Sequence, residues 1–306
     1  MKHGPRGIIP AMLTIFGKDD MVDVEGQKRY AEWLIGKGVH GLAPCGSTGE
    51  GAALTDDERV QVVKATVEAS AGRVPVIGGI IGYSTTLAVN LAKRYREIGA
   101  DGVMCLLPFY YHPNINDALN HLRAVSKAWG GPIMVYNNPW FAGYELTPQQ
   151  VKVLADEGVV DSIKAAHGDP MRCDYIKYLC GDKVSVLYGH DYAPLESFCV
   201  GADGWLSGLP NVVPDLCVAL FNAIDKDHDL DEARKIWGRI LPIAYYFMYV
   251  RRSNDDPHWL PMIKDAIRMQ GMDVGYPRLP ATDLKPEDKK ILYDYLVKVY
   301  PNIKLV

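Results

Sequence analysis

A lysine at the end of an apolar run is the residue best suited to covalent chemistry in this sequence. Lys164 follows Val-Val-Asp-Ser-Ile at residues 159–163. Burying an ammonium ion is costly, and a lysine amine that has lost its extra proton is the nucleophile that condenses with a ketone to form an imine. The alternative is a side chain that points outward or pairs with a carboxylate. The residues alone leave both possibilities open.

Small and hydroxyl-bearing residues form a second candidate group, Pro-Cys-Gly-Ser-Thr-Gly-Glu at residues 44–50. Its glycines allow backbone amides to approach a ligand, and Ser47 and Thr48 present hydroxyls beside them. Such a turn suits a carboxylate or a phosphate, although it can also be an ordinary connection between strand and helix. Cys45 would need a nearby base to act as a nucleophile, and buried cysteines are usually inert.

Two tyrosines and two histidines complete the candidates. Tyr136 ends the run Met-Val-Tyr at residues 134–136, and Tyr110 lies in Leu-Pro-Phe-Tyr-Tyr-His-Pro at residues 107–113. Each is either a packed ring or a phenol directed at a reacting centre. His190 and Asp191, with His167, could suggest a metal site, but no two-histidine helix motif supports one. We therefore expect no metal.

The elements that must position these residues follow a βα pattern. Eight short β-rich runs are expected as strands, at residues 7–14, 39–44, 74–80, 102–107, 132–136, 160–165, 184–189 and 204–207. A helical segment follows each strand, at residues 24–37, 55–71, 85–98, 116–129, 148–157, 170–180, 193–200 and 214–224. Eight such units favour an α/β fold of the (β/α)8 TIM barrel type over an open sheet. In such barrels the reacting groups stand at the C-terminal ends of the strands, where the candidates above lie.

The last part of the chain has a different pattern. Beyond residue 228 only helical periods remain, at residues 231–250, 258–270 and 287–299. We therefore expect a barrel over residues 1–228 that carries the active site, and a C-terminal helical extension over residues 229–306.

Composition excludes several classes of function. The chain has 33 basic and 37 acidic residues and a net charge of −4, so no broad basic field is expected to bind nucleic acid. No apolar run reaches the roughly 20 residues needed to span a bilayer, so no membrane partner is expected. The six cysteines form no CxxC pair, which fits a reducing, cytoplasmic location.

Taken in order, four motifs resemble the N-acetylneuraminate lyase and dihydrodipicolinate synthase family of Schiff-base, pyruvate-dependent aldolases. They are Gly-Ser-Thr-Gly-Glu at 46–50, Pro-Phe-Tyr-Tyr at 108–111, Val-Tyr-Asn-Asn-Pro at 135–139 and Ile-Lys-Ala at 163–165. The resemblance implies that Lys164 forms the imine and Tyr136 transfers protons. It also implies a hydroxyl relay of Ser47 with Tyr110, in which Tyr110 reaches into a neighbouring subunit's site.

The resemblance further implies partners and binding residues. The expected partners are a 2-oxo acid such as pyruvate and an aldehyde, with no metal or organic cofactor, in a homo-oligomer built as a dimer of dimers. The amides of Ser47 and Thr48 match those that hold the carboxylate of the 2-oxo acid. The expected substrate-binding residues are Gly46, Thr48, Asn138, Phe141, Asp191, Tyr192 and Ser207.

Two departures from the family pattern bear on the substrate. Phe141 stands where the synthases usually have an arginine that grips the carboxylate of the aldehyde, and Tyr192 replaces the glutamate of the sialate lyases. An apolar ring cannot bind a carboxylate. We expect a less polar aldehyde, such as an aromatic one, in an outer pocket of aromatic rings, although the same rings could simply pack the barrel rim. These rings are Trp140, Phe141, Tyr144, Tyr192 and Trp205.

The leading functional hypothesis is a class I lyase that cleaves or forms a 2-oxo acid through a Lys164 Schiff base, including a hydratase-aldolase acting on an aromatic substrate. An enzyme with the same imine could instead dehydrate or deaminate a 2-oxo sugar acid, or act as a dihydrodipicolinate synthase. From different classes, a metal-dependent aldolase or hydrolase and a non-catalytic sensor of 2-oxo acids remain as rivals.

Overall fold

Parallel strands form the centre of the molecule. The computed structural model describes residues 4–82, 84–249 and 258–301, and within them one sheet has seven strands in the order β1-β7-β6-β5-β4-β3-β2. All its strand pairs are parallel, so the prediction of a parallel α/β fold is confirmed. The strands are β1 (Gly7–Pro10), β2 (Ile77–Ile80), β3 (Gly102–Leu106), β4 (Ile133–Asn137), β5 (Val160–Ala165), β6 (Ser185–Tyr188) and β7 (Gly204–Ser207).

The strand predicted at residues 39–44 is not a regular strand. Two isolated parallel bridges replace it, one between Ala43 and Ala11 beyond β1, and one between Leu42 and Val76 before β2. The ladder cannot be continuous here because prolines 10 and 44 have no N–H to donate. Their carbonyls still accept hydrogen bonds, from the N–H of Ala43 at 3.1 Å and of Gly79 at 2.9 Å respectively. The segment thus connects the two edge strands of the curled sheet.

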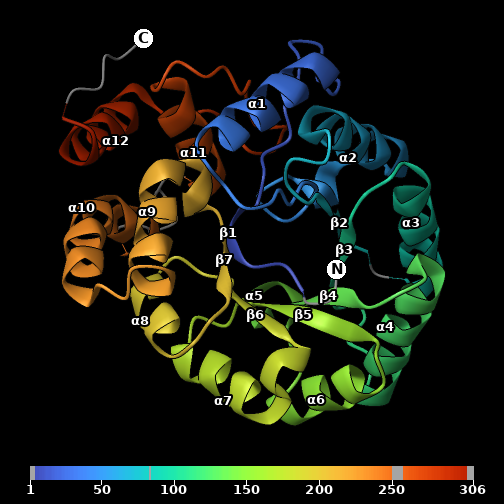
Figure 1. The fold of residues 1–306 in the computed structure, drawn as a ribbon. Coiled ribbons are helices and arrows are strands. Elements are labelled where there is room, and N and C mark those ends of the chain that lie inside the picture. The colour runs from blue at the N-terminus through green and yellow to red at the C-terminus, as the bar shows by residue number, and fades with distance from the viewer. Residues whose placement is uncertain (1–3, 83, 250–257, 302–306) are drawn as a thin grey trace.

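Helices surround the strands (Figure 1). A capping box begins the helix at residues 56–70, because the Thr55 N–H donates to the Glu58 carboxylate at 2.8 Å while the Glu58 N–H donates to the Thr55 hydroxyl at 3.3 Å. One four-residue helix, α5 (Pro139–Ala142), was not expected. The others that follow strands are α1 (Val24–Gly36), α2 (Asp56–Ser70), α3 (Thr85–Glu97), α4 (Ile115–Trp129), α6 (Pro148–Asp156), α7 (Pro170–Cys180), α8 (Pro194–Cys199) and α9 (Pro214–Asp225).

Three more helices follow the last strand. They are α10 (Leu230–Tyr249), α11 (Trp259–Arg268) and α12 (Pro286–Val299). They agree with the predicted helical periods, apart from residue 250, which lies outside the described residues. In Figure 1 they gather on one side of the ring, where α10 packs on α9 and α12, and α11 packs on α12.

Buried side chains fall into two clusters on the two faces of the sheet. One fills the space inside it and includes Met104, Met134 and Leu187. The other lies between the sheet and the helices and includes Ile163. Because successive side chains of a strand point to opposite faces, this alternation decides which residues face the interior.

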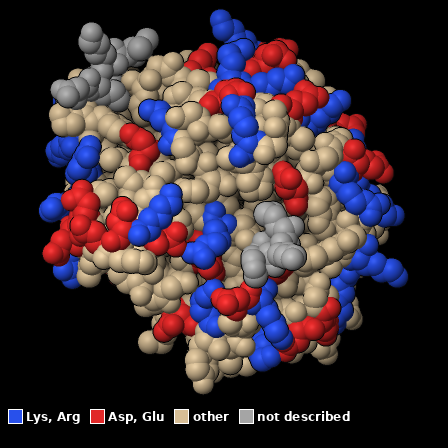
Figure 2. Space-filling view, in the orientation of Figure 1, with Lys and Arg blue, Asp and Glu red and all other residues tan. Residues whose placement is uncertain are grey.

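The surface carries both signs of charge. Basic and acidic side chains are interspersed over the face drawn in Figure 2, as the near balance of 33 basic and 37 acidic residues leads one to expect. In the part of the chain that the structure describes, no helix is both long and apolar enough to cross a membrane.

Candidate active site

Lys164 and Tyr136 face each other inside the curled sheet. They are register partners on the neighbouring strands β5 and β4, and each residue is only 3% exposed. The Lys164 Nζ lies 4.0 Å from the centre of the Tyr136 ring. Since Ile163 packs toward the helices, the alternation along β5 turns Lys164 to the interior. The outward-pointing lysine that the sequence left open is therefore not what the fold adopts.

The hydroxyl of Tyr136 has two polar neighbours. Asn138 Nδ2 donates to it at 2.9 Å, and Ser47 Oγ lies 3.4 Å away. The Asn138 Oδ1 accepts from the N–H groups of Trp140 and Phe141 at the start of α5, so the cap of that short helix turns the Asn138 amide nitrogen toward the tyrosine.

Electrostatics at Tyr136 favour loss of its proton. Burial by itself raises the pKa of the hydroxyl, but the positive charge of Lys164 and the hydrogen bonds with Ser47 and Asn138 outweigh it, and the pKa is lowered from 10.0. A phenol with a lowered pKa can accept and return a proton nearer to neutral pH. The arrangement can thus combine an amine nucleophile with a proton-transfer group.

The turn at residues 46–50 lies at the same end of the sheet. Its shape needs a glycine at position 49, where a Cβ would lie 2.7 Å from the carbonyl oxygen of Met12. Glu50 N donates to the Ser47 carbonyl at 3.1 Å and Gly51 N to the Gly46 carbonyl at 3.0 Å, which closes the turn. The neighbouring Cys45 is a poor nucleophile, because burial raises the pKa of its thiol to about 12.

Asp191, Thr48 and Ser207 gather next to this turn. Gly208 directly follows β7, and a Cβ added to it would lie 3.5 Å from Asp191 Oδ2 and 3.9 Å from Thr48 Oγ1. The turn and the end of β7 therefore meet at this position. Asp191 Oδ2 accepts from the Leu209 N–H at 3.2 Å, while its Oδ1 is buried and has no hydrogen-bond partner within the described chain. Burial raises the pKa of Asp191 to about 6, although the hydroxyl of Ser207 partly opposes the shift.

Asp191 should therefore make stability depend on pH. Because its folded pKa of about 6 lies above the ordinary 3.8, the native state binds this proton more tightly and the free energy of unfolding falls as pH rises through that window. We expect Asp191→Asn to raise the free energy of unfolding by about 2 kcal/mol at about pH 7.5 and to change it little at about pH 4. Urea denaturation at the two pH values measures this. An equal change at both would contradict it, and Asp182→Asn on the surface is the control.

The two histidines at this end are held neutral. Burial lowers the pKa of His167 and of His190 to about 4 in each case. Tyr192 stacks on the His190 ring with 4.0 Å between the centroids. Nowhere in the described ranges do three His, Cys, Asp or Glu side chains come together as a metal ligand set. The set of His190, Asp191 and His167 considered above is therefore not assembled.

Tyr110 lies apart from the other candidates. It is 71% exposed and packs edge-on against Tyr111, with 4.9 Å between ring centroids. No hydrogen bond of the described residues joins Tyr110 to Ser47. Within one chain, the structure thus brings Lys164, Tyr136 and Ser47 together and leaves Tyr110 outside.

The described residues do not bring together the five aromatic rings that were predicted to form an outer pocket. Trp205 is fully buried and donates its indole N–H to the His190 carbonyl at 2.8 Å, so it belongs to the core. Tyr144 packs against His112 instead, and Trp140 is 69% exposed. The prediction failed because a ring adjacent in sequence to the site can face either side of a strand or loop.

A cavity of about 640 Å³ nevertheless opens beside the turn, and Phe141 lines it together with Ser47. Phe109 and Trp259 also line it, and sequence reasoning missed both in this role. Trp259 lies in α11, and no local pattern reveals that this distant helix covers the end of the sheet.

Comparisons with known proteins agree on one family. The Dihydrodipicolinate synthetase family matches residues 4–298. A 4-hydroxy-tetrahydrodipicolinate synthase from Pelobacter propionicus is 33% identical over 279 residues, which cover 91% of this chain and 93% of that protein. The solved dihydrodipicolinate synthase from Aquifex aeolicus is similar with a TM-score of 0.88 at 30% identity, covering 98% of this chain and 99% of that one. YagE, a prophage protein of the dihydrodipicolinic acid synthase family from E. coli K12 solved in complex with pyruvate, has a TM-score of 0.89 at 28% identity, covering 96% and 98%.

These matches confirm the resemblance drawn from the motifs. The curated relatives are named for synthase activity, which supports the alternative of dihydrodipicolinate synthesis better than the leading hypothesis. The protein is an enzyme of the Schiff-base lyase type, whose chemistry needs no metal or external cofactor. The chain belongs to the Dihydrodipicolinate synthetase family.

Proposed function

We propose that the protein joins pyruvate to an aldehyde, or separates the two, through an imine between Lys164 and the C2 carbon of the 2-oxo acid. One observation carries this proposal. The amine of a buried lysine lies 4.0 Å from the ring of Tyr136, whose hydroxyl meets Ser47 and Asn138. A nucleophile and a proton-transfer group are thus in place, as Schiff-base chemistry requires.

The proposed reaction begins when the Lys164 amine attacks the ketone and water leaves, which forms an iminium. The iminium draws electrons from the neighbouring bonds, so C3 can lose a proton to Tyr136 and become a nucleophilic enamine. The enamine attacks the aldehyde carbonyl, and the new alkoxide takes back the proton from Tyr136. Water then hydrolyses the product iminium, which releases the 2-oxo acid and frees the Lys164 amine. In the reverse direction the bond between C3 and C4 breaks. The Ser47 and Thr48 amides hold the carboxylate, which makes each step effectively intramolecular.

We further propose that a second copy completes the site. Tyr110 and Tyr111 form an exposed edge-on pair, and in a tight dimer such a pair can extend the Ser47 hydroxyl relay of the neighbouring copy. Two such dimers would form the tetramer implied by the family resemblance.

The finer architecture belongs to the same proposal. Residues 39–44 take the place of the eighth strand of a (β/α)8 barrel, supported by their bridges to both edge strands. The barrel would span residues 1–228, and residues 229–306 would form the C-terminal helical extension, supported by the packing of α10, α11 and α12 on one another and on α9.

Two classes of aldehyde are candidates. The names of the relatives favour the synthase reaction, in which the aldehyde carries a carboxylate. A specific observation supports an apolar aldehyde as the second candidate, because Phe141 and the rings of Phe109 and Trp259 line the cavity beside Ser47. The aromatic rings favour apolar surface, whereas Arg278 and Lys285, which line the same cavity, can donate to a carboxylate, so the lining fits both classes.

Borohydride trapping tests the proposal. Borohydride with pyruvate should inactivate the enzyme and attach the reduced pyruvate to Lys164, as peptide mass spectrometry can detect, whereas borohydride alone should not. A chelator should leave turnover unchanged. A panel of carboxylate-bearing, aromatic and polyhydroxylated aldehydes then identifies the acceptor.

Other results would reject parts of the proposal. Label on a different lysine, or no label at all, would refute the imine at Lys164. Measurable pyruvate binding without turnover of any aldehyde would support the sensor instead. A preference for polyhydroxylated aldehydes would exclude both acceptor classes.

A further inference from the structure

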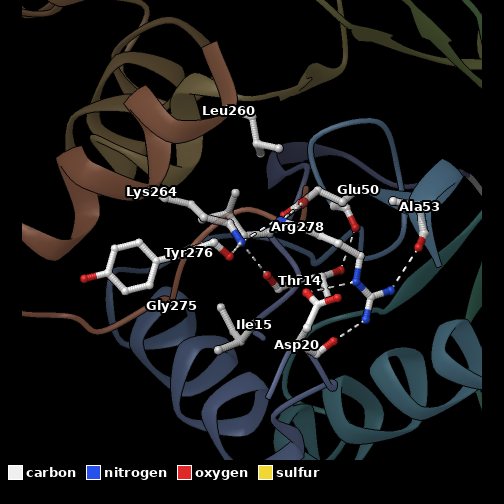
Figure 3. A network of polar contacts seen from close by, with 12 residues as sticks. Thr14, Ile15, Asp20, Glu50, Ala53, Leu260, Lys264, Gly275, Tyr276 and Arg278 are labelled. Carbon is white, nitrogen blue, oxygen red and sulfur yellow. Dashed lines mark hydrogen bonds and ion pairs between the residues drawn. The ribbon is translucent and has the colours of Figure 1, made fainter. Parts of the chain in front are cut away.

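A buried ion pair connects the turn that carries Ser47 to helix α11 (Figure 3). The Lys264 Nζ lies 2.8 Å from Glu50 Oε1, and the two side chains are 0% and 5% exposed. The same ammonium donates to the carbonyls of Thr14 at 3.0 Å and Tyr276 at 2.8 Å. The buried ammonium thus has two carbonyl acceptors and a carboxylate of opposite charge beside it, which is the condition for keeping a charge buried.

The second carboxylate oxygen of Glu50 is also held by a residue from the C-terminal part of the chain. The backbone N–H of Arg278 donates to Glu50 Oε2 at 2.8 Å. The guanidinium of Arg278 donates to the Ala53 carbonyl at 2.9 Å, just beyond the turn, and to Glu58 at 2.7 Å. As Figure 3 shows, residues from the C-terminal part of the chain thus hold both oxygens of the Glu50 carboxylate and the backbone that follows it.

The turn needs such support because its backbone is unfavourable at both ends. Cys45 has φ +61° and Glu50 has φ +55°, which is the left-handed region that residues with a Cβ rarely adopt. Such conformations persist only where the surrounding contacts fix them. At Glu50 those contacts are made by its own carboxylate.

We propose that Lys264 is a positioning residue for the proposed reaction, because its ion pair with Glu50 fixes the backbone of the turn and so directs the Ser47 and Thr48 amides at the carboxylate of the 2-oxo acid. This inference rests on the proposed function. The amides bind the carboxylate before and during the reaction, so their displacement weakens pyruvate binding more than it slows the bound complex.

Lys264→Met, which keeps an unbranched apolar stem and removes the charged amine, tests this. We expect the KM for pyruvate, and the pyruvate concentration that half-saturates borohydride inactivation, to rise by about tenfold or more, while kcat changes by less than about threefold. Lys177→Met is the matched control. It breaks the ion pair of Lys177 with Asp203 at 3.0 Å, and Asp203 precedes β7 at the opposite end of the sheet, so both pyruvate measures should stay unchanged.

A double variant separates positioning from stability. Lys264→Met alone leaves the Glu50 carboxylate buried without its cation, which destabilises the fold. Lys264→Met with Glu50→Gln removes both charges and should recover thermal stability while the pyruvate KM stays raised.

The failures of the two proposals can be told apart. If either variant folded and kept the pyruvate KM of the unmodified enzyme, the proposed role of Lys264 would be wrong. If the proposed function itself were wrong, pyruvate and borohydride would not inactivate the unmodified enzyme.

Discussion

Replacement of Lys164 by arginine or alanine is expected to lower kcat by at least about a thousandfold, because among the described residues it is the amine of Lys164 that lies against Tyr136 and can form the imine. Arginine keeps a cation beside Tyr136, and alanine removes it, yet neither has a primary amine to condense with the ketone. The two variants should therefore fail equally, although their effects on the ring of Tyr136 differ. Steady-state turnover and borohydride trapping with pyruvate measure the loss.

The control for Lys164 is a lysine in a similar setting. Lys177 of α7 is 20% exposed and pairs with Asp203, and Lys177→Arg should keep both turnover and trapping. Thermal melting and circular dichroism verify that the Lys164 variants are folded. A folded Lys164→Ala enzyme that retained more than a tenth of the activity would exclude the covalent mechanism.

Local sequence patterns were sufficient for most of the fold. The apolar run that ends at Lys164 corresponds to β5, and its partner strand ends one residue beyond the predicted Tyr136. Both predictions rest on a signal inside a short window, namely a β-rich run. The segment at residues 39–44 has the same signal, but prolines in it and in β1 interrupt the ladder, so only two bridges form.

Local sequence patterns could not predict contacts between segments that are distant in the sequence. The ion pair of Lys264 with Glu50 joins α11 to a turn near the start of the chain, and nothing in the sequence around either residue indicates it. The same reason explains why Trp259 was missed and Trp205 was misplaced. Alternation shows which residues share a face, but only the assembled fold decides which distant helix covers that face.

Tyr136→Phe is expected to lower kcat by about a hundredfold to ten-thousandfold, the usual contribution of a positioned acid or base. Phenylalanine keeps the ring against Lys164 and loses the hydroxyl that meets Ser47 and Asn138. The lysine is still present, so pyruvate should still be trapped by borohydride. A fall in turnover that leaves trapping intact is thus the result that separates the role of Tyr136 from that of Lys164.

The pH dependence of the rate adds a second test of Tyr136. Its pKa is lowered from 10.0, because the charge of Lys164 and its hydrogen bonds outweigh burial. If the phenolate takes the C3 proton, the rate rises with pH through this lowered pKa, below the range of an ordinary tyrosine. That rise should be absent in Tyr136→Phe and preserved in Tyr30→Phe, which removes another buried hydroxyl, bonded to Asn211 at 2.6 Å. If Tyr136→Phe kept the same rise, the proton would have to pass through another group, and the cluster around Tyr136 would serve binding alone.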